Sequence, residues 1–233
     1  AAARDVARRQ LATFPEDYPI LVPSASCAGM LKVQYPKLFA GTPDEERARR
    51  LAGRVHELTD YLARVLDWRH PDLGPPLKVA LHHSCSARRE LGVAGAAADL
   101  LARLANLEVV EPDHAQECCG FGGTFAVKQP EISAAMAADK AAAILATGAQ
   151  VLVGQDCGCL LNLGGTLAHR YPQAGMAQAG KGADPGAGDG ASALQGAAAH
   201  AGSGRVTNPP APLSRGPVVK HIAELLWERT HAP

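Results

Sequence analysis

The sequence is poor in aromatic residues, which make up only 4% of its 233 residues. A hydrophobic core must therefore be built mainly from Ala, Leu and Val. The chain also lacks an excess of charge of either sign, since Lys plus Arg and Asp plus Glu each number 23. This balance gives no electrostatic reason to expect a nucleic acid or an anionic membrane as a partner. No apolar run reaches about 18 residues, so no membrane span is predicted, and no signal peptide is visible.

Cysteine is the informative residue type that is present. Of the six cysteines, four form tight pairs in the sequence, Cys118–Cys119 and Cys157–Gly158–Cys159. Without a secretory signal, disulfide bonds are the weaker interpretation of such pairs. Metal binding or redox chemistry is the stronger one.

The hydrophobic pattern alternates between short apolar strands and helices. This alternation predicts an α/β fold with a mainly parallel sheet. One long helix is expected over Asp44–Leu66, capped by Thr42 and Glu45. The predicted strands are 18–22, 77–81, 107–110, 151–153 and one near 218, and the other predicted helices are 4–13, 94–104, 130–147 and one that ends near 229.

A weak internal repeat organises this pattern. Leu21-Val22 leads to Cys27 in the same way that Leu152-Val153 leads to Cys157. The chain is therefore predicted to contain two pseudo-repeated α/β units. The first unit, residues 1–70, is expected to be N-terminally truncated. The second, residues 71–233, carries a low-complexity insertion at 173–214, which is too poor in large apolar residues to order itself.

Five cysteines are expected to meet at one edge of the sheet, because the loops after parallel strands gather at their carboxyl ends. These predicted ligands are Cys85, Cys118, Cys119, Cys157 and Cys159. Glycines beside the paired cysteines allow backbone amides to approach cluster sulfurs.

The identity of the metal follows less directly from the residues. Adjacent cysteines suit a polynuclear iron–sulfur cluster, in which two thiolates reach different irons. A single zinc ion needs only four ligands, usually spaced as C-x2-C. Zinc and a purely structural or dithiol role remain alternatives.

The motif Cys118-Cys119-Gly120, with Cys85 upstream and a cysteine pair downstream, resembles the cysteine-rich CCG domain. That domain is found in a subunit of heterodisulfide reductase and in the iron–sulfur subunit of glycolate oxidase. The longer string from Cys118 to Lys128 resembles the lactate utilization protein A family more narrowly. Two further stretches carry the same resemblance, Pro23–Cys27 and Asp156–Asn162.

This resemblance implies two CCG repeats and a 4Fe–4S-type cluster, which is non-cubane in the heterodisulfide reductase relatives. It implies a cytoplasmic system that oxidises L-lactate to pyruvate, with a ferredoxin-domain iron–sulfur subunit and a third subunit as partners. Cys27 would belong to a first-repeat metal site that is incomplete in this chain. The C-x-C spacing of Cys157 and Cys159 departs from the C-x-x-C of the wider domain. A disulfide-reducing subunit and a zinc-stabilised interaction subunit are the alternatives.

Other candidate residues have weaker signals. Gly120, Gly122 and Gly123 do not form the G-x-G-x-x-G motif of dinucleotide-binding loops, because Phe125 stands where the third glycine of that motif would be. His82 is interpreted as a sheet residue and His83 as polar lining, although either could bond a cluster sulfur. Lys128 could direct positive charge at the cluster. Asp156 is predicted to cap the loop that carries Cys157.

Overall fold

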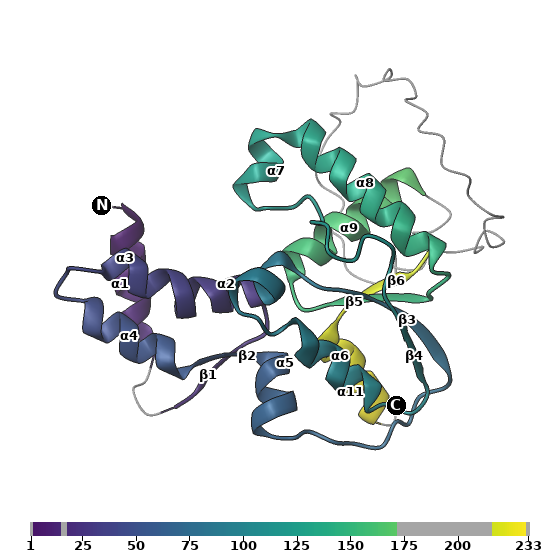
Figure 1. Cartoon of the computed structure of the whole chain (residues 1–233), viewed down its shortest axis with the longest axis horizontal. Coiled ribbons are helices and arrows are strands. Elements are labelled where there is room, and N and C mark those ends of the chain that lie inside the picture. Colours follow the sequence, from purple (N-terminus) through teal and green to yellow (C-terminus); the bar gives the residue numbers. More distant parts are fainter. Residues whose placement is uncertain (1, 15–17, 172–215, 232–233) are drawn as a thin grey trace, which may run out of the picture.

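The computed structural model describes residues 2–14, 18–171 and 216–231. It has an α/β fold, as predicted, with two parallel sheets (Figure 1). The predicted insertion at 173–214 lies outside the described residues. Among the ranges described, no helix is both long and apolar enough to cross a membrane.

The smaller sheet pairs β1 (Ile20–Val22) with β2 (Val55–Glu57). The larger sheet has the strand order β4-β3-β5-β6, with every neighbouring pair parallel. Its strands are β3 (Leu77–His82), β4 (Leu107–Val110), β5 (Val151–Gly154) and β6 (Val218–His221). The longer helices are α1 (Ala2–Thr13), α4 (Glu45–Arg54), α6 (Ala94–Ala102), α8 (Pro130–Ala146), α9 (Cys157–Arg170) and α11 (Ile222–Thr230). The shorter helices are α2 (Ala25–Gly29), α3 (Tyr35–Phe39), α5 (Leu58–Asp60) and α7 (Thr124–Lys128), and π-helical turns cover Met30–Gln34, Tyr61–Val65 and Ser86–Glu90.

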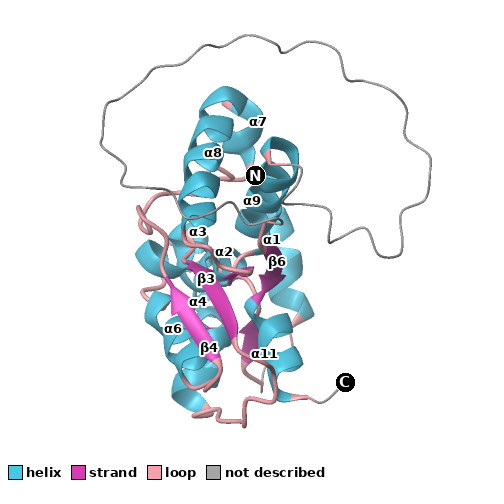
Figure 2. Cartoon of the chain, turned by 90° about the vertical axis from the view of Figure 1, so that its right-hand side faces the viewer, coloured by secondary structure: helices cyan, strands magenta, loops and turns pink. Residues whose placement is uncertain are grey.

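Helices cover both faces of the larger sheet, because the side chains of each strand alternate between the faces. Val79 and Leu81 pack with α6 and α11, whereas Ala80 packs with α8 and α9 on the opposite face. Figure 2 shows this sheet from the side, enclosed by its helices. A third hydrophobic cluster, built on α1, α3 and α4, forms the core of the N-terminal lobe. The central strands β3 and β5 are therefore buried on both sides, as parallel strands usually are.

The predicted helix over Asp44–Leu66 is wrong in its middle. The chain leaves α4 at Arg54, forms β2, and resumes helical structure at Leu58. Val55 is fully buried and pairs with Ile20 of β1. A three-residue strand does not disturb a helical apolar stripe, so only the pairing with a distant strand reveals it. The cap also differs, because Asp44 occupies the N-cap position and Glu45 accepts a hydrogen bond from the Gly41 amide.

The two lobes meet through polar side chains as well as apolar ones. The side-chain nitrogen Nε2 of Gln155, just after β5, donates to Thr59 Oγ1 at 2.6 Å and to Glu57 Oε2 at 3.4 Å. The His221 ring lies 2.6 Å from the carbonyl oxygen of Pro23, which follows β1. These contacts tie the ends of the smaller sheet to the ends of β5 and β6. The division into repeats at residue 70 stays a prediction.

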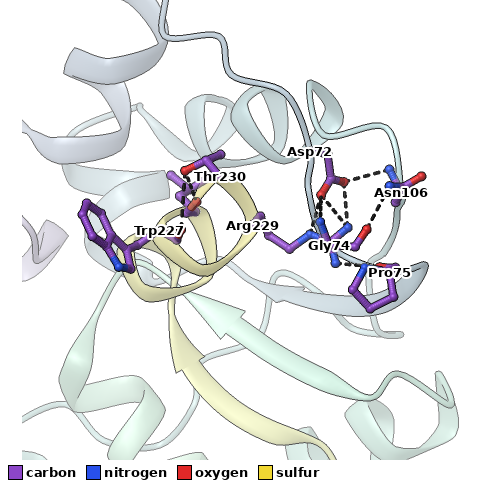
Figure 3. A network of polar contacts seen from close by, with 8 residues as sticks. Asp72, Gly74, Pro75, Asn106, Trp227, Arg229 and Thr230 are labelled. Atoms are coloured by element: carbon purple, nitrogen blue, oxygen red, sulfur yellow. Dashed lines mark hydrogen bonds and ion pairs between the residues drawn. The ribbon is translucent and has the colours of Figure 1, made fainter. Parts of the chain in front are cut away.

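A buried ion pair anchors the C-terminal helix. Arg229 of α11 donates from Nε and Nη2 to the two carboxylate oxygens of Asp72, each at 2.7 Å (Figure 3). Asp72 also accepts from the backbone amides of Gly74 and Asn106. This network joins α11 to the segments that lead into β3 and β4.

Candidate metal centre

Three segments that follow strands of the larger sheet carry the cysteines of the predicted site. Cys85 comes three residues after His82, the last residue of β3. Cys118 and Cys119 lie in the loop between β4 and α7, and Cys159 lies in the first turn of α9, which follows β5. Because the strands are parallel, all three segments lie at the carboxyl edge of the sheet. The topology therefore brings cysteines far apart in the sequence to one place.

Cys119, Cys159 and His82 form the most compact part of this site. One ligand atom from each residue lies within 4.8 Å of the other two, and all three residues are buried. The thiol of Cys159 donates to Cys119, which lowers the pKa of Cys119 and raises the pKa of Cys159. One thiolate is thus already favoured here, and the thiolate is the form that binds metal.

Cys118 and Cys85 form a second pair beside the first. Burial raises the pKa of Cys118 to about 11, and the neighbouring Cys85 and Cys119 add to this effect. The backbone amide of Gly120 opposes it, because it donates to Cys118 Sγ at 3.4 Å. Four of the predicted thiols, those of Cys85, Cys118, Cys119 and Cys159, therefore converge.

The turn that carries the adjacent cysteines depends on Gly120. Its φ is +83°, and a Cβ atom there would lie 2.4 Å from the backbone oxygen of Ser133 in α8. Ser133 Oγ donates to the Gly120 oxygen at 2.8 Å, and Asn162 Nδ2 of α9 donates to the Cys119 oxygen at 2.8 Å. The turn is thus held between two helices, with no room for a side chain at residue 120.

Cys157 has different surroundings from the four converging cysteines. It is the first residue of α9, and its exposed side chain lines a hollow with Val219, Lys220 and His221. Gly158, between the two cysteines, packs against the ring of Phe121, where a Cβ atom would lie 2.4 Å from the nearest ring carbon. The prediction that Cys157 binds metal stays a prediction.

Cys27 is exposed and is the third residue of α2 in the N-terminal lobe. Helix α2 begins three residues after β1 ends, and α9 begins three residues after β5 ends. If α2 is matched with α9, Cys27 is the equivalent of Cys159. The sequence pattern alone instead made Cys27 the equivalent of Cys157. The duplication and the first-repeat site stay predictions.

Charged and polar residues around the thiols include one that sequence reasoning missed. Lys140 of α8 is 1% exposed and donates to the His114 oxygen at 2.7 Å. Burial lowers its pKa, while the nearby Cys119 and Cys85 raise it. A single lysine on the Ala-rich face of a predicted helix was the available signal. Lys128, by contrast, is exposed.

His83 and Asp156 make specific contacts. His83 is buried, its ring lies 3.1 Å from Glu111 Oε1, and burial lowers its pKa. Asp156 occupies the N-cap position of α9 but makes no side-chain cap bond there. Its carboxylate instead accepts from the amide and hydroxyl of Ser26, at 2.8 and 3.1 Å. The expected capping role is therefore directed at α2, because the starts of the two helices lie together.

Most of the chain is similar to known proteins. Residues 79–164, which include the four converging cysteines, match the CCG family, described as "Cysteine-rich domain". Lactate utilization protein A of Bacillus licheniformis is 43% identical over 166 residues, covering 70% of this chain and 68% of that protein. Its namesake from Bacillus subtilis is 40% identical over 171 residues, covering 72% of this chain and 71% of that protein. These matches confirm the resemblance predicted from the cysteine motifs: the chain belongs to the lactate utilization protein A family.

Proposed function

We propose that this chain is an iron–sulfur electron-transfer subunit of a system that oxidises L-lactate to pyruvate. The observation that carries the proposal is the convergence of the Cys85, Cys118, Cys119 and Cys159 thiols at the carboxyl edge of the sheet. The names of the relatives supply the link to lactate.

The donor set at this edge suits a cluster of the 4Fe–4S type. The thiols form two neighbouring pairs, Cys85 with Cys118 and Cys119 with Cys159. Both ring nitrogens of the adjacent His82 are buried without a hydrogen-bond partner among the described residues. Soft thiolate ligands favour iron–sulfur clusters and zinc over hard cations such as magnesium. When bound, an iron–sulfur cluster accepts and donates single electrons.

The chain itself supplies position and charge compensation. The Gly120 turn places Cys118 and Cys119 and directs an amide at the Cys118 sulfur. Lys140 lies close enough to Cys119 and Cys85 for their charges to affect its pKa. A buried cation offsets the negative charge that several thiolates bring to one place. These features favour deprotonated, metal-binding cysteines.

We also propose the setting in which the subunit works. It acts in the cytoplasm with a ferredoxin-domain iron–sulfur subunit and a third lactate-utilization subunit. Among the described residues, we identify no group that would remove a hydride from lactate. Substrate oxidation is therefore assigned to the assembled complex.

A zinc-stabilised interaction subunit is the second candidate. The group of Cys119, Cys159 and His82, with ligand atoms within 4.8 Å of one another, is compact enough for one ion. Such a site would be structural, without a redox role.

Anaerobic purification of the full chain distinguishes these functions. Iron with inorganic sulfide, and a visible band that bleaches on reduction, supports the cluster, whereas zinc without sulfide supports the interaction subunit. Lactate-dependent bleaching in the reconstituted complex is expected for lactate oxidation, and bleaching reversed only by a disulfide would favour the reductase alternative.

Cysteine variants locate the site. Cys118→Ser and Cys119→Ser are each expected to abolish or alter the cluster, because each removes a thiolate from the converging set. Cys27→Ser is the matched control, since Cys27 is exposed in the N-terminal lobe. Unchanged iron and sulfide in both test variants would remove these two residues from the ligand set.

A further inference from the structure

His82 is a buried imidazole whose hydrogen-bonding groups lack partners. The residue is 2% exposed, and neither Nδ1 nor Nε2 has a hydrogen-bond partner among the described residues. Leaving a buried polar group without a hydrogen bond is unfavourable. His83, the next residue, is also buried, and its Nε2 lies 3.1 Å from Glu111 Oε1, whereas its Nδ1 has no hydrogen-bond partner among the described residues. The His82 ring lies beside the Cys119 thiol, whose pKa it lowers, so a metal bound to that thiolate would also be within reach of a His82 nitrogen.

The position of the ring indicates what that partner is. One His82 nitrogen and the sulfurs of Cys119 and Cys159 lie within 4.8 Å of one another. Metal–sulfur and metal–nitrogen bonds of about 2.3 and 2.0–2.1 Å allow one metal to contact ligands separated by up to roughly 4.4 Å. After a small adjustment of the side chains, the three atoms could therefore serve one metal centre.

The helix that carries Cys159 directs Cys157 elsewhere. Residues two apart on an α-helix are about 200° apart around its axis, since there are 3.6 residues per turn. Side chains at this spacing do not face the same neighbour. Cys159 is buried against Cys119, whereas Cys157 is exposed beside Lys220 and His221. A C-x-x-C spacing would place both thiols on nearly one face, but this chain has C-x-C.

We propose that His82 is a direct ligand, through one ring nitrogen, of the iron–sulfur cluster held by Cys85, Cys118, Cys119 and Cys159. The ligands at this edge are then Cys85, Cys118, Cys119, Cys159 and His82, and Cys157 is not among them. This inference deepens the proposed function and rests on it. Replacing a thiolate by a neutral imidazole raises the reduction potential of an iron–sulfur centre, as in clusters with mixed histidine and cysteine ligation.

The test is spectroscopic and uses the full chain with all partners absent. The protein is purified anaerobically with its histidines labelled with 15N or left at natural abundance. Pulsed electron paramagnetic resonance of the cluster then measures nitrogen hyperfine coupling. His82→Cys and Cys157→Ser are compared with His83→Gln, which changes the neighbouring buried histidine. Iron, sulfide and midpoint potential are measured for each protein.

We expect the strong nitrogen coupling of a bound imidazole, with the isotope change expected for histidine. His83→Gln and Cys157→Ser should keep it, whereas His82→Cys should retain iron, lose the coupling and shift the potential downward. A wild-type cluster with only weak coupling, or a coupling that survives His82→Cys, would overturn the assignment while leaving the cluster and the proposed function intact. Loss of iron in Cys157→Ser alone would overturn the ligand set. Absence of iron and sulfide from the wild type would reject the proposed function as well.

Discussion

Replacing Gly120 by alanine tests whether the CCG turn positions the thiols. A Cβ atom at residue 120 would lie 2.4 Å from the Ser133 oxygen and 3.2 Å from the Ala137 nitrogen. Ordinary van der Waals contacts of such an atom begin near 3.4 Å. The turn or α8 must therefore move by about 1 Å. Cys118 and Cys119, which directly precede residue 120, would move with the turn. Metal–ligand distances tolerate only about 0.2 Å.

The energetic cost has two parts. An alanine at positive φ costs roughly 1–2 kcal/mol, and overpacking against backbone typically costs about 1–3 kcal/mol more. Gly120→Ala should thus destabilise the protein by about 2–5 kcal/mol in total. Gly148→Ala is the matched control, because Gly148 also has positive φ, at +67°, but a Cβ atom there meets nothing within 4 Å. Only the first part of the cost applies to the control.

Metal analysis and thermal unfolding separate the two variants. Each 1 kcal/mol lowers the melting temperature by roughly 2–4 °C in a chain of this size. Gly120→Ala should lose most of its iron and sulfide, and Gly148→Ala should keep both despite a modest fall in melting temperature. Equal iron contents in the two variants would refute the role assigned to the turn, whatever their stabilities.

Two further predictions concern buried charges. Arg229→Met leaves Asp72, whose side chain is 1% exposed, without its cation, and should destabilise the chain by about 3–5 kcal/mol. Arg69→Met, at an exposed pair with Asp67, should change the stability much less, because solvent screens this pair. Denaturant unfolding compares them, and similar losses would contradict the reasoning. Glu57 is 3% exposed, and burial raises its pKa. A raised folded pKa means that the stability from Glu57 is fully present below its unfolded value and is lost as pH rises through the folded one. Glu57→Gln should therefore flatten the decline of stability with pH, measured by unfolding from acidic to neutral pH, and parallel curves for the two proteins would contradict this.

The alternation of strands and helices was predictable because each element carries its own pattern of apolar residues. Pro130 and Gly148, for example, mark the ends of α8 in the sequence itself. The break at Val55–Glu57 was not predictable, because the strand exists through pairing with β1 and is consistent with the apolar stripe of a helix. Asp156 was placed correctly at a helix start, but its partner is Ser26, which lies 130 residues away.

The sequence by itself determined which thiols exist, that Cys118 and Cys119 precede a glycine turn, and that the cysteine loops follow short apolar segments predicted as strands. These are local properties, set by residue type and short-range pattern. Only the tertiary structure decided that Cys159 is buried with Cys119 and His82 while Cys157 is exposed. The direction of a side chain depends on where its helix begins and on what packs beside it, and both depend on contacts between distant parts of the chain.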